Sequence, residues 1–422
     1  MKHIVNIARI IVGNLFIFSG IVKANDPLGF SYKLEEYFVE FGMSWSWLMD
    51  ISVPLAALLC IVEIVLGVAV LVGYKMKPTS WALLLMIVFF TILTGASAIF
   101  EIVRSCGCFG DAIPLTPWQS FYKDLVLLIF ILIIFAYRNK IEPWKSTRDL
   151  IIVFAVSTII LVLLALMLKW SMAGEVLALI WLTVLVQHYA KNEKLAAMIA
   201  VVFSLVFGIY VSVVATNYLP FKDFRPYAIG KNIPSQMVMA PGAKQPIYKN
   251  TLIYENTQTG ETKAFTQEEY TDSKIWEHEE WEWRDTKSKL IEEGELPTIT
   301  DFMIQGNEGD DYTDIILSEN QVLVIVAYNL QKAKNNHWDE ISALVKKAES
   351  KGVTVIGLSA AGTAEKEAYK EKYNLPFDFY VSDEIVLKTI IRSNPGLMLM
   401  EQGTVSNKWH VNKLPKLEQF LN

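Results

Sequence analysis

The stretch VPLAALLCIVEIVLGVAVLVG, residues 53–73, contains a single charged residue, Glu63. About 20 apolar helical residues cross the hydrocarbon core of a bilayer, so this stretch, within an apolar segment over 50–73, predicts a transmembrane helix. Residues 1–218 contain six more segments of this kind, which lie near 4–22, 80–100, 119–137, 149–168, 172–189 and 195–217. The sequence therefore predicts an α-helical membrane bundle of about seven transmembrane helices.

The composition changes after Tyr218. From there to the end, charged residues are dense and apolar runs are short, which predicts a soluble domain over 219–422. The net charge of the whole chain is only -6, and this argues against a nucleic-acid partner.

The basic residues of the short loops predict the orientation of the bundle. Cytoplasmic loops carry an excess of Lys and Arg, and here most of these residues fall on one side of the predicted spans. With seven spans, the amino terminus is then cytoplasmic and the C-terminal domain periplasmic, in a bacterial inner membrane. The residues on the predicted cytoplasmic side are Lys2, Arg9, Lys75, Lys77, Arg138, Lys140, Lys145, Arg148, Lys191 and Lys194.

Glu63 lies in the middle of its predicted span. A carboxylate at this depth is costly unless it faces the bundle interior, where it can be protonated or paired. Two interpretations stay open: a hydrogen bond that joins two helices, or a proton-handling group for redox chemistry.

Two of the three cysteines of the chain occur in EIVRSCGCFGDAIPL, residues 101–115, on the predicted outer side, where disulfides persist. Gly107 between Cys106 and Cys108 leaves room for a small, strained disulfide ring, and strained disulfides tend to be reactive. The nearby cation of Arg104 favours the thiolate form. A redox pair and an inert structural disulfide remain alternatives. Two cysteines without a histidine in the loop cannot complete a zinc site, so no metal is predicted.

Three motifs together resemble the DoxX superfamily and, within it, the methylamine-utilisation MauE type. They are FSGIVKANDPLGF over 18–30, the Glu63–Gly67 spacing, and CGCFGD over 106–111. The resemblance covers a four-helix unit over 1–137, and 138–218 adds three helices. It implies periplasmic thiol–disulfide chemistry through Cys106 and Cys108, with quinone as a candidate cofactor and Lys23 and Arg104 as candidate binding residues.

Strands and helices alternate in the C-terminal part of the chain. We expect strands over 321–328, 353–359 and 377–381, helices over 336–350, 363–373, 384–392 and 414–421, and a closing hairpin between the last two helices. This pattern resembles the thioredoxin superfamily, in particular its TlpA-like members, over 296–422. The resemblance implies a cis peptide bond before Pro395 and a peptide-binding groove beside it. The C-x-x-C motif is missing, because 330–338 reads LQKAKNNHW.

Residues 219–295 are expected to be a periplasmic linker. Its prolines predict extended chain over 220–247, and TLIYENTQTGETKAFT, residues 251–266, predicts a hairpin that turns at 257–261.

Taken together, the motifs favour a membrane component of envelope thiol–disulfide chemistry, a possible thiol–disulfide oxidoreductase whose partners are envelope proteins. The alternative is a non-catalytic accessory subunit that binds other envelope proteins through its thiol-free domain. A carrier of small molecules or lipids that uses the interior around Glu63 is a third interpretation.

Overall fold

The computed structural model describes residues 2–100, 107, 109–144, 147–168, 179–182, 185–186, 189, 192–239, 242–244, 247–278, 280–292, 296–417 and 420. The chain divides into two compact units, one of residues 1–231 and 303–422 and the other of residues 232–302. The first unit contains the helical bundle and an α/β domain with a mixed sheet.

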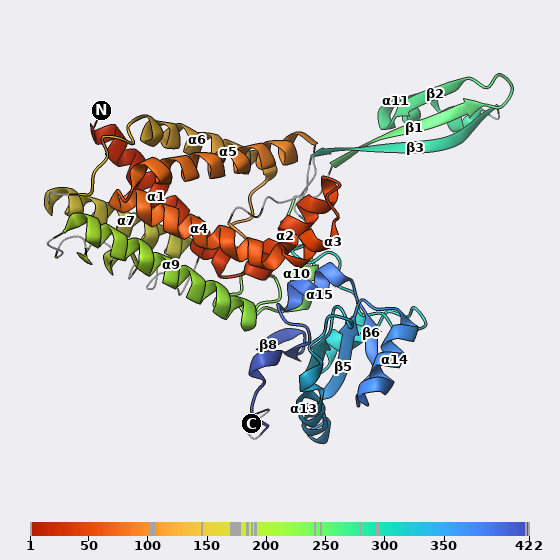
Figure 1. The fold of residues 1–422 in the computed structure, drawn as a ribbon. Coiled ribbons are helices and arrows are strands. Elements are labelled where there is room, and N and C mark those ends of the chain that lie inside the picture. The colour runs from red at the N-terminus through yellow and green to blue at the C-terminus, as the bar shows by residue number, and fades with distance from the viewer. Residues whose placement is uncertain are drawn as a thin grey trace. The chain divides into compact units, whose positions relative to one another are not determined.

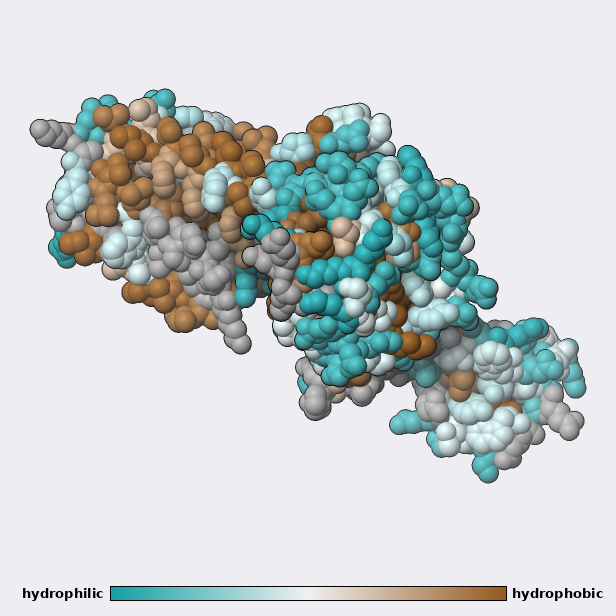
Figure 2. Space-filling view, turned by 90° about the horizontal axis from the view of Figure 1, so that it is seen from below, coloured by the Kyte–Doolittle hydropathy of each residue, from teal (hydrophilic) through white to brown (hydrophobic). Residues whose placement is uncertain are grey.

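Six helices among the described residues are long and apolar enough to cross a membrane. They confirm six of the expected spans, and the seventh, over 172–189, lies mostly outside the described residues. Much of the bundle surface is apolar (Figure 2), with Leu85 and Ile92 about two-thirds exposed (66% and 67%), as expected for side chains that face lipid. The six are α1 Lys2–Ala24, α4 Ser52–Val72, α5 Met76–Phe100, α6 Pro117–Ala136, α7 Thr147–Leu168 and α9 Glu193–Asn217 (Figure 1).

Helices α1 and α4 approach each other closely through glycines. A Cβ at Gly67 would lie 2.8 Å from the carbonyl oxygen of Gly13 and from the backbone nitrogen of Ile17. A Cβ at Gly20 would lie 2.9 Å from the carbonyl oxygen of Cys60. Small residues of this kind let membrane helices approach backbone to backbone. The two helices therefore form the rigid centre on which Glu63 is placed.

The loop between the first two spans folds into α2, Pro27–Glu40, and α3, Ser46–Asp50. Asp26 caps α2 by accepting a hydrogen bond from the backbone N–H of Gly29, and Pro27 occupies the first helical position, where a missing N–H has no cost. Phe30 is buried, while Trp47 is exposed. The two helices thus carry both buried and exposed aromatic residues.

The α/β domain has a five-stranded sheet in the order β6-β5-β4-β7-β8. Strand β4 pairs in parallel with β5, and β5 with β6, whereas β7 is antiparallel to both β4 and β8. The expected alternation of strands and helices and the closing hairpin are confirmed. The elements are α12 Thr313–Ser318, β4 Val322–Val326, α13 Trp338–Ser350, β5 Thr354–Ser359, α14 Thr363–Tyr373, β6 Phe379–Val381, α15 Glu384–Ile390, β7 Gly396–Glu401 and β8 Thr404–His410.

Two expectations for this part of the chain are wrong. Residues 414–417 are not helical, because Pro415 disfavours helical backbone at the residue before it and Leu414 is extended. The remaining residues of that expected helix are mostly outside the described part. Residues 220–247 are not extended throughout, because α10, Ile233–Met237, begins with Pro234 in its first turn and is capped by Asn232.

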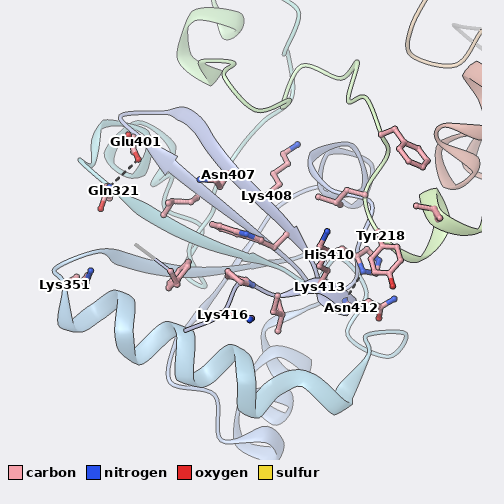
Figure 3. Close-up of a pocket in the computed structure, with 18 residues that line it drawn as sticks. Tyr218, Gln321, Lys351, Glu401, Asn407, Lys408, His410, Asn412, Lys413 and Lys416 are labelled. Carbon is pink, nitrogen blue, oxygen red and sulfur yellow. Dashed lines mark hydrogen bonds between the residues drawn. The ribbon is translucent and has the colours of Figure 1, made fainter. Parts of the chain in front are cut away.

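A cavity of about 1440 Å³ lies against β8 and the chain that follows it (Figure 3). Its lining combines lysines, including Lys413 and Lys416, with aromatic residues such as Tyr218 and Trp409. No residue that the sequence analysis proposed as a site residue lines it, so the candidate site lies elsewhere.

The second unit is a three-stranded antiparallel sheet in the order β2-β1-β3, and it confirms the expected hairpin. Thr266 and Glu269 form a capping box at the start of α11. The rings of Tyr254, Tyr270 and Trp276 pack together beside the sheet. Its elements are β1 Ile247–Asn256, β2 Thr262–Thr266, α11 Gln267–Ser273 and β3 Trp281–Glu292.

Candidate functional site

A buried ion pair joins α1 to α4. Lys23 Nζ lies 2.5 Å from Glu63 Oε1, and both side chains are 4% exposed. Ser19, one helical turn before Lys23, donates a hydrogen bond from its hydroxyl to Glu63 Oε2 at 2.9 Å. Glu63 thus faces the bundle interior and has partners on both oxygens, and its cationic partner is a residue of the FSGIVK motif.

A second ion pair lies on α6. Lys123 Nζ is 2.5 Å from Asp124 Oδ1, and Thr94 of α5 donates a hydrogen bond to Asp124 Oδ2 at 3.2 Å. Asp124 is buried. The sequence analysis missed this pair, although two adjacent charges inside the predicted span 119–137 are a recognisable signal, since charges in spans are rare.

Both ion pairs line one small cavity of about 40 Å³ in the bundle interior. A polar cavity of this size can hold a water molecule. Phe109 also lines it, with its ring 5.7 Å from that of Phe18 and 5.4 Å from Lys123 Nζ. Phe109 directly follows Cys108, so the chain next to the cysteine pair borders a cavity that contains four charged side chains.

Lys23 also lines a second cavity of about 40 Å³, together with Gly107 and Asp111. Gly107 has a φ of +68°, which glycine adopts without strain, and a Cβ there would lie 3.3 Å from Lys33 Cγ of α2. Cys106, Cys108 and Arg104 are outside the described residues. Their neighbours Gly107 and Phe109 nevertheless line the two cavities that share Lys23.

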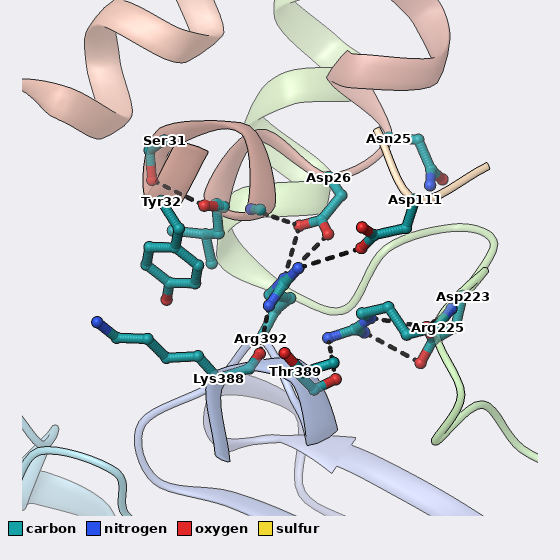
Figure 4. A network of polar contacts seen from close by, with 12 residues as sticks. Asn25, Asp26, Ser31, Tyr32, Asp111, Asp223, Arg225, Lys388, Thr389 and Arg392 are labelled. Carbon is teal, nitrogen blue, oxygen red and sulfur yellow. Dashed lines mark hydrogen bonds and ion pairs between the residues drawn. The ribbon is translucent and has the colours of Figure 1, made fainter. Parts of the chain in front are cut away.

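The α/β domain contributes Arg392 to this region (Figure 4). Its guanidinium is buried and contacts Asp26 Oδ2 at 2.9 Å and Asp111 Oδ2 at 3.4 Å. Burial alone would lower the pKa of Arg392, but the carboxylates of Asp26 and Asp111 outweigh it, and the net pKa is raised. The side chain therefore stays charged at every physiological pH.

Tyr328 follows β4 and lies two residues before 330–338, the segment that lacks the C-x-x-C motif. Its hydroxyl is 3.2 Å from the hydroxyl of Tyr32 on α2, and Lys388 Nζ lies 4.8 Å from the Tyr32 ring centroid. Burial and the neighbouring Tyr328 raise the pKa of Tyr32. The chain between β4 and that segment thus contacts the bundle.

A second polar cluster joins the chain after α9 to the α/β domain. Asp223 pairs with Arg225 at 2.7 Å and with Lys408 at 3.0 Å. Burial opposes ionisation of Asp223, but the two cations outweigh it and lower its pKa to about 2. Burial lowers the pKa of Lys408 to about 8 despite the attraction of Asp223. Arg225 also donates a hydrogen bond to the carbonyl of Thr389 at 2.9 Å.

Pro395, the remaining predicted binding residue, is buried beside β7. The Asn394–Pro395 bond is cis, as expected. Asn394 donates a hydrogen bond to the carbonyl of Asn329 at 2.7 Å, which ties this loop to the end of β4. The role of Pro395 in peptide binding stays a prediction.

In the part of the chain that the structure describes, no three His, Cys, Asp or Glu side chains come together in a way that could hold a metal ion. Cys106 and Cys108 lie outside that part, so the prediction of no metal remains a prediction.

The family model described as methylamine utilisation protein MauE matches residues 1–137. This N-terminal part of the chain is thus similar to the MauE family. The curated protein TlpB of Flavobacterium psychrophilum is 27% identical over 161 residues, which cover 36% of this chain and 41% of TlpB. The chain thus spans about two fifths of the length of that relative. No solved structure matches the chain.

The region that matches the MauE model, residues 1–137, supplies both ion pairs, Phe109 beside them and both carboxylates that Arg392 contacts. Of the residues that the sequence predicted, the structure brings Lys23 and Glu63 into direct contact. It adds Asp26, Asp124 and Arg392, which the sequence analysis did not single out.

Proposed function

We propose that this protein is a membrane component of envelope thiol–disulfide exchange, with Cys106 and Cys108 as its redox pair. The observation that carries the proposal is the position of Gly107 and Phe109. These neighbours of the two cysteines line two cavities that share Lys23, and Glu63 also lines the one that Phe109 borders. A cysteine pair at a charged, partly enclosed site is typical of reactive rather than structural thiols.

The chemistry is a two-electron exchange. A thiolate of a client protein attacks the Cys106–Cys108 disulfide, forms a mixed disulfide and releases the other cysteine of the pair as a thiolate. The second client thiolate then displaces the bound cysteine, which leaves an oxidised client and a reduced pair. A quinone, the acceptor class that we propose, takes two electrons and two protons, becomes a quinol and regenerates the disulfide.

The buried ion pairs support the protonation steps. The ammonium groups of Lys23 and Lys123 favour thiolate nearby, as the predicted Arg104 does. Glu63 and Asp124 border a cavity with room for water, so each can pass a proton between the thiols and the acceptor.

The proposal places the cysteine loop and the α/β domain in the periplasm, with the bundle in a bacterial inner membrane. The distribution of Lys and Arg over the short loops supports this orientation. The proposed partners are periplasmic proteins that carry thiols.

Trapping of mixed disulfides in intact cells tests the proposal. In one of the variants Cys106→Ala and Cys108→Ala, the remaining thiol should accumulate a covalent complex with client proteins that reductant releases. Cys60→Ser is the matched control, because Cys60 is a buried free thiol in α4, and it should behave as the unaltered protein. Full function of both alanine variants with no trapped complex would overturn the proposal.

A non-catalytic accessory role is the second candidate. It is favoured by Tyr328, which lies two residues before the segment without the motif and contacts α2 of the bundle. In this case both cysteine variants keep full function, and loss of function follows only when envelope partners no longer bind the α/β domain.

A further inference from the structure

All three nitrogens of the Arg392 guanidinium have partners at the contact between the α/β domain and the bundle (Figure 4). Nε donates to both oxygens of Asp26, at 3.1 and 2.9 Å, and Nη2 contacts Asp111 at 3.4 Å. Nη1 donates to the carbonyl of Lys388, and the guanidinium carbon lies 5.3 Å from the Tyr32 ring centroid. One side chain thus joins two carboxylates that belong to different segments of the region that matches the MauE model.

The α/β domain fixes the direction of this side chain. The carbonyl of Lys388 lies in the last turn of α15, at the end of the helix that attracts cations. Ser393, which directly follows Arg392, is buried and donates a hydrogen bond to the carbonyl of Pro395 at 2.6 Å. A buried guanidinium is stable only with counter-charges, and Asp26 and Asp111 supply them.

Asp111 connects this contact to the cysteine pair. It lies three residues after Cys108, in a segment closed by two turns: Gly110 N–H donates to the Gly107 carbonyl at 3.0 Å, and Ala112 N–H to the Phe109 carbonyl at 3.2 Å. Because these two hydrogen bonds tie the segment together, a shift of Asp111 is passed on to Gly107 and Phe109.

Of the two carboxylates that Arg392 contacts, Asp26 forms the stronger ion pair. Its side chain is 18% exposed, against 49% for Asp111, and it also caps α2. An ion pair with a half-exposed carboxylate is weak, so the bond to Asp111 is the one that can be broken without loss of the fold.

The backbone at Gly29 lies directly against the Arg392 guanidinium and the Asp26 carboxylate. A Cβ at Gly29 would lie 2.6 Å from Arg392 Nη2 and 2.4 Å from Asp26 Oδ2. A methyl group there must displace the guanidinium or the carboxylate, although alanine is otherwise favourable in a helix. Gly29→Ala therefore disturbs the contact without changing any charge.

We propose that Arg392 is a positioning residue through which the α/β domain holds the Cys106–Cys108 loop, by bridging Asp26 at the start of α2 and Asp111 in that loop. The positioning role of Arg392 rests on the observed contacts alone, whereas its effect on thiol–disulfide chemistry rests on the proposed function. The α/β domain is then a permanent binding partner of the cysteine loop. It contacts the bundle and has no C-x-x-C motif of its own.

The test uses the full chain in lipid nanodiscs with Cys60→Ser, so that only the two loop thiols react. After reduction, the rate of alkylation of Cys106 and Cys108 by a maleimide is measured for Arg392→Lys, Gly29→Ala and Asp111→Asn. Lysine keeps the charge but cannot bridge two carboxylates as the planar fork does. Each variant should raise the rate about two- to fivefold, the range expected for a weak ion pair.

Tyr328→Phe is the matched control. It removes the hydrogen bond to Tyr32 in the same contact region but leaves the contacts of Arg392 with Asp26 and Asp111 in place, so it should leave the alkylation rate unchanged. In glutathione buffer, the disulfide fraction of the loop pair should rise in the three test variants and not in this control, because a freed loop relaxes the small ring.

Two results would overturn the positioning role of Arg392. One is an unchanged alkylation rate in both Arg392→Lys and Gly29→Ala, and the other is an equal rise in Tyr328→Phe, which would show a general loosening of the domain. Thermal melts of all variants identify any that fail to fold, and Gly29→Ala then serves as the independent test. If the alkylation rates rise as expected but no client protein is trapped in cells, the positioning role of Arg392 holds and the proposed function fails. If clients are trapped but the alkylation rates do not change, only the positioning role is rejected.

Discussion

Replacing Glu63 by glutamine leaves the ammonium of Lys23 buried without this carboxylate as its counter-charge. The two groups are 2.5 Å apart and each side chain is 4% exposed, so bulk solvent does not replace the lost carboxylate. Breaking a buried ion pair by removing one partner costs about 3–5 kcal/mol. At about 2–4 °C per kcal/mol for a cooperative unit of about 150–250 residues, Glu63→Gln should lower the apparent Tm by about 6–20 °C.

The assay is thermal unfolding of the full chain in nanodiscs, followed by circular dichroism at a fixed scan rate. Glu40→Gln is the matched control, because Glu40 lies exposed at the end of α2 and its replacement should leave the Tm unchanged. The double variant Lys23→Met with Glu63→Gln removes both charges, and it should recover most of the lost stability, since neither charge of the pair remains buried.

The reasoning would be refuted by either of two outcomes. If Glu63→Gln lowers the stability by less than about 1 kcal/mol, the pair behaves like an exposed ion pair. If the double variant loses the sum of the two single effects, the two side chains do not act on each other.

Three further predictions concern other parts of the chain. Gly67→Ala should destabilise the bundle by about 1–3 kcal/mol because its Cβ meets backbone at 2.8 Å, whereas Gly208→Ala, whose nearest neighbour would be 3.5 Å away, should cost nothing in the same melt. Asp124→Asn should lower stability by about 1–3 kcal/mol by removing the carboxylate that Lys123 Nζ contacts, measured against the unaltered chain in the same melt. Burial lowers the pKa of His410 from 6.5 to about 4, so the stability that the neutral imidazole contributes is complete above pH 6.5 and is lost as the pH falls towards 4. Hydrogen exchange of the amides around β8 should therefore accelerate as the pH falls from 6.5 to about 4. The variant His410→Gln should abolish this pH dependence.

The local sequence was sufficient for most of the architecture. Apolar runs of about 20 residues predicted the spans that α4 and α5 form, and the buried run over 321–328 predicted β4. These features depend on residues close together in the chain, where hydrophobic periodicity and helix length decide the outcome. Where a local signal was ambiguous, as with Pro234, the sequence alone predicted extended chain and the structure has a helix that starts there.

The site depended on tertiary structure. The sequence placed Lys23 in a motif and Glu63 in a span, but their contact depends on how α1 and α4 align through Gly67. Arg392 reaches Asp26 across 366 positions in the chain, and no periodicity links residues so far apart. Whether a buried charge meets its counter-charge is decided by the register of one element against another, because electrostatic attraction in a poorly solvated interior acts over a few ångströms of space and not along the chain.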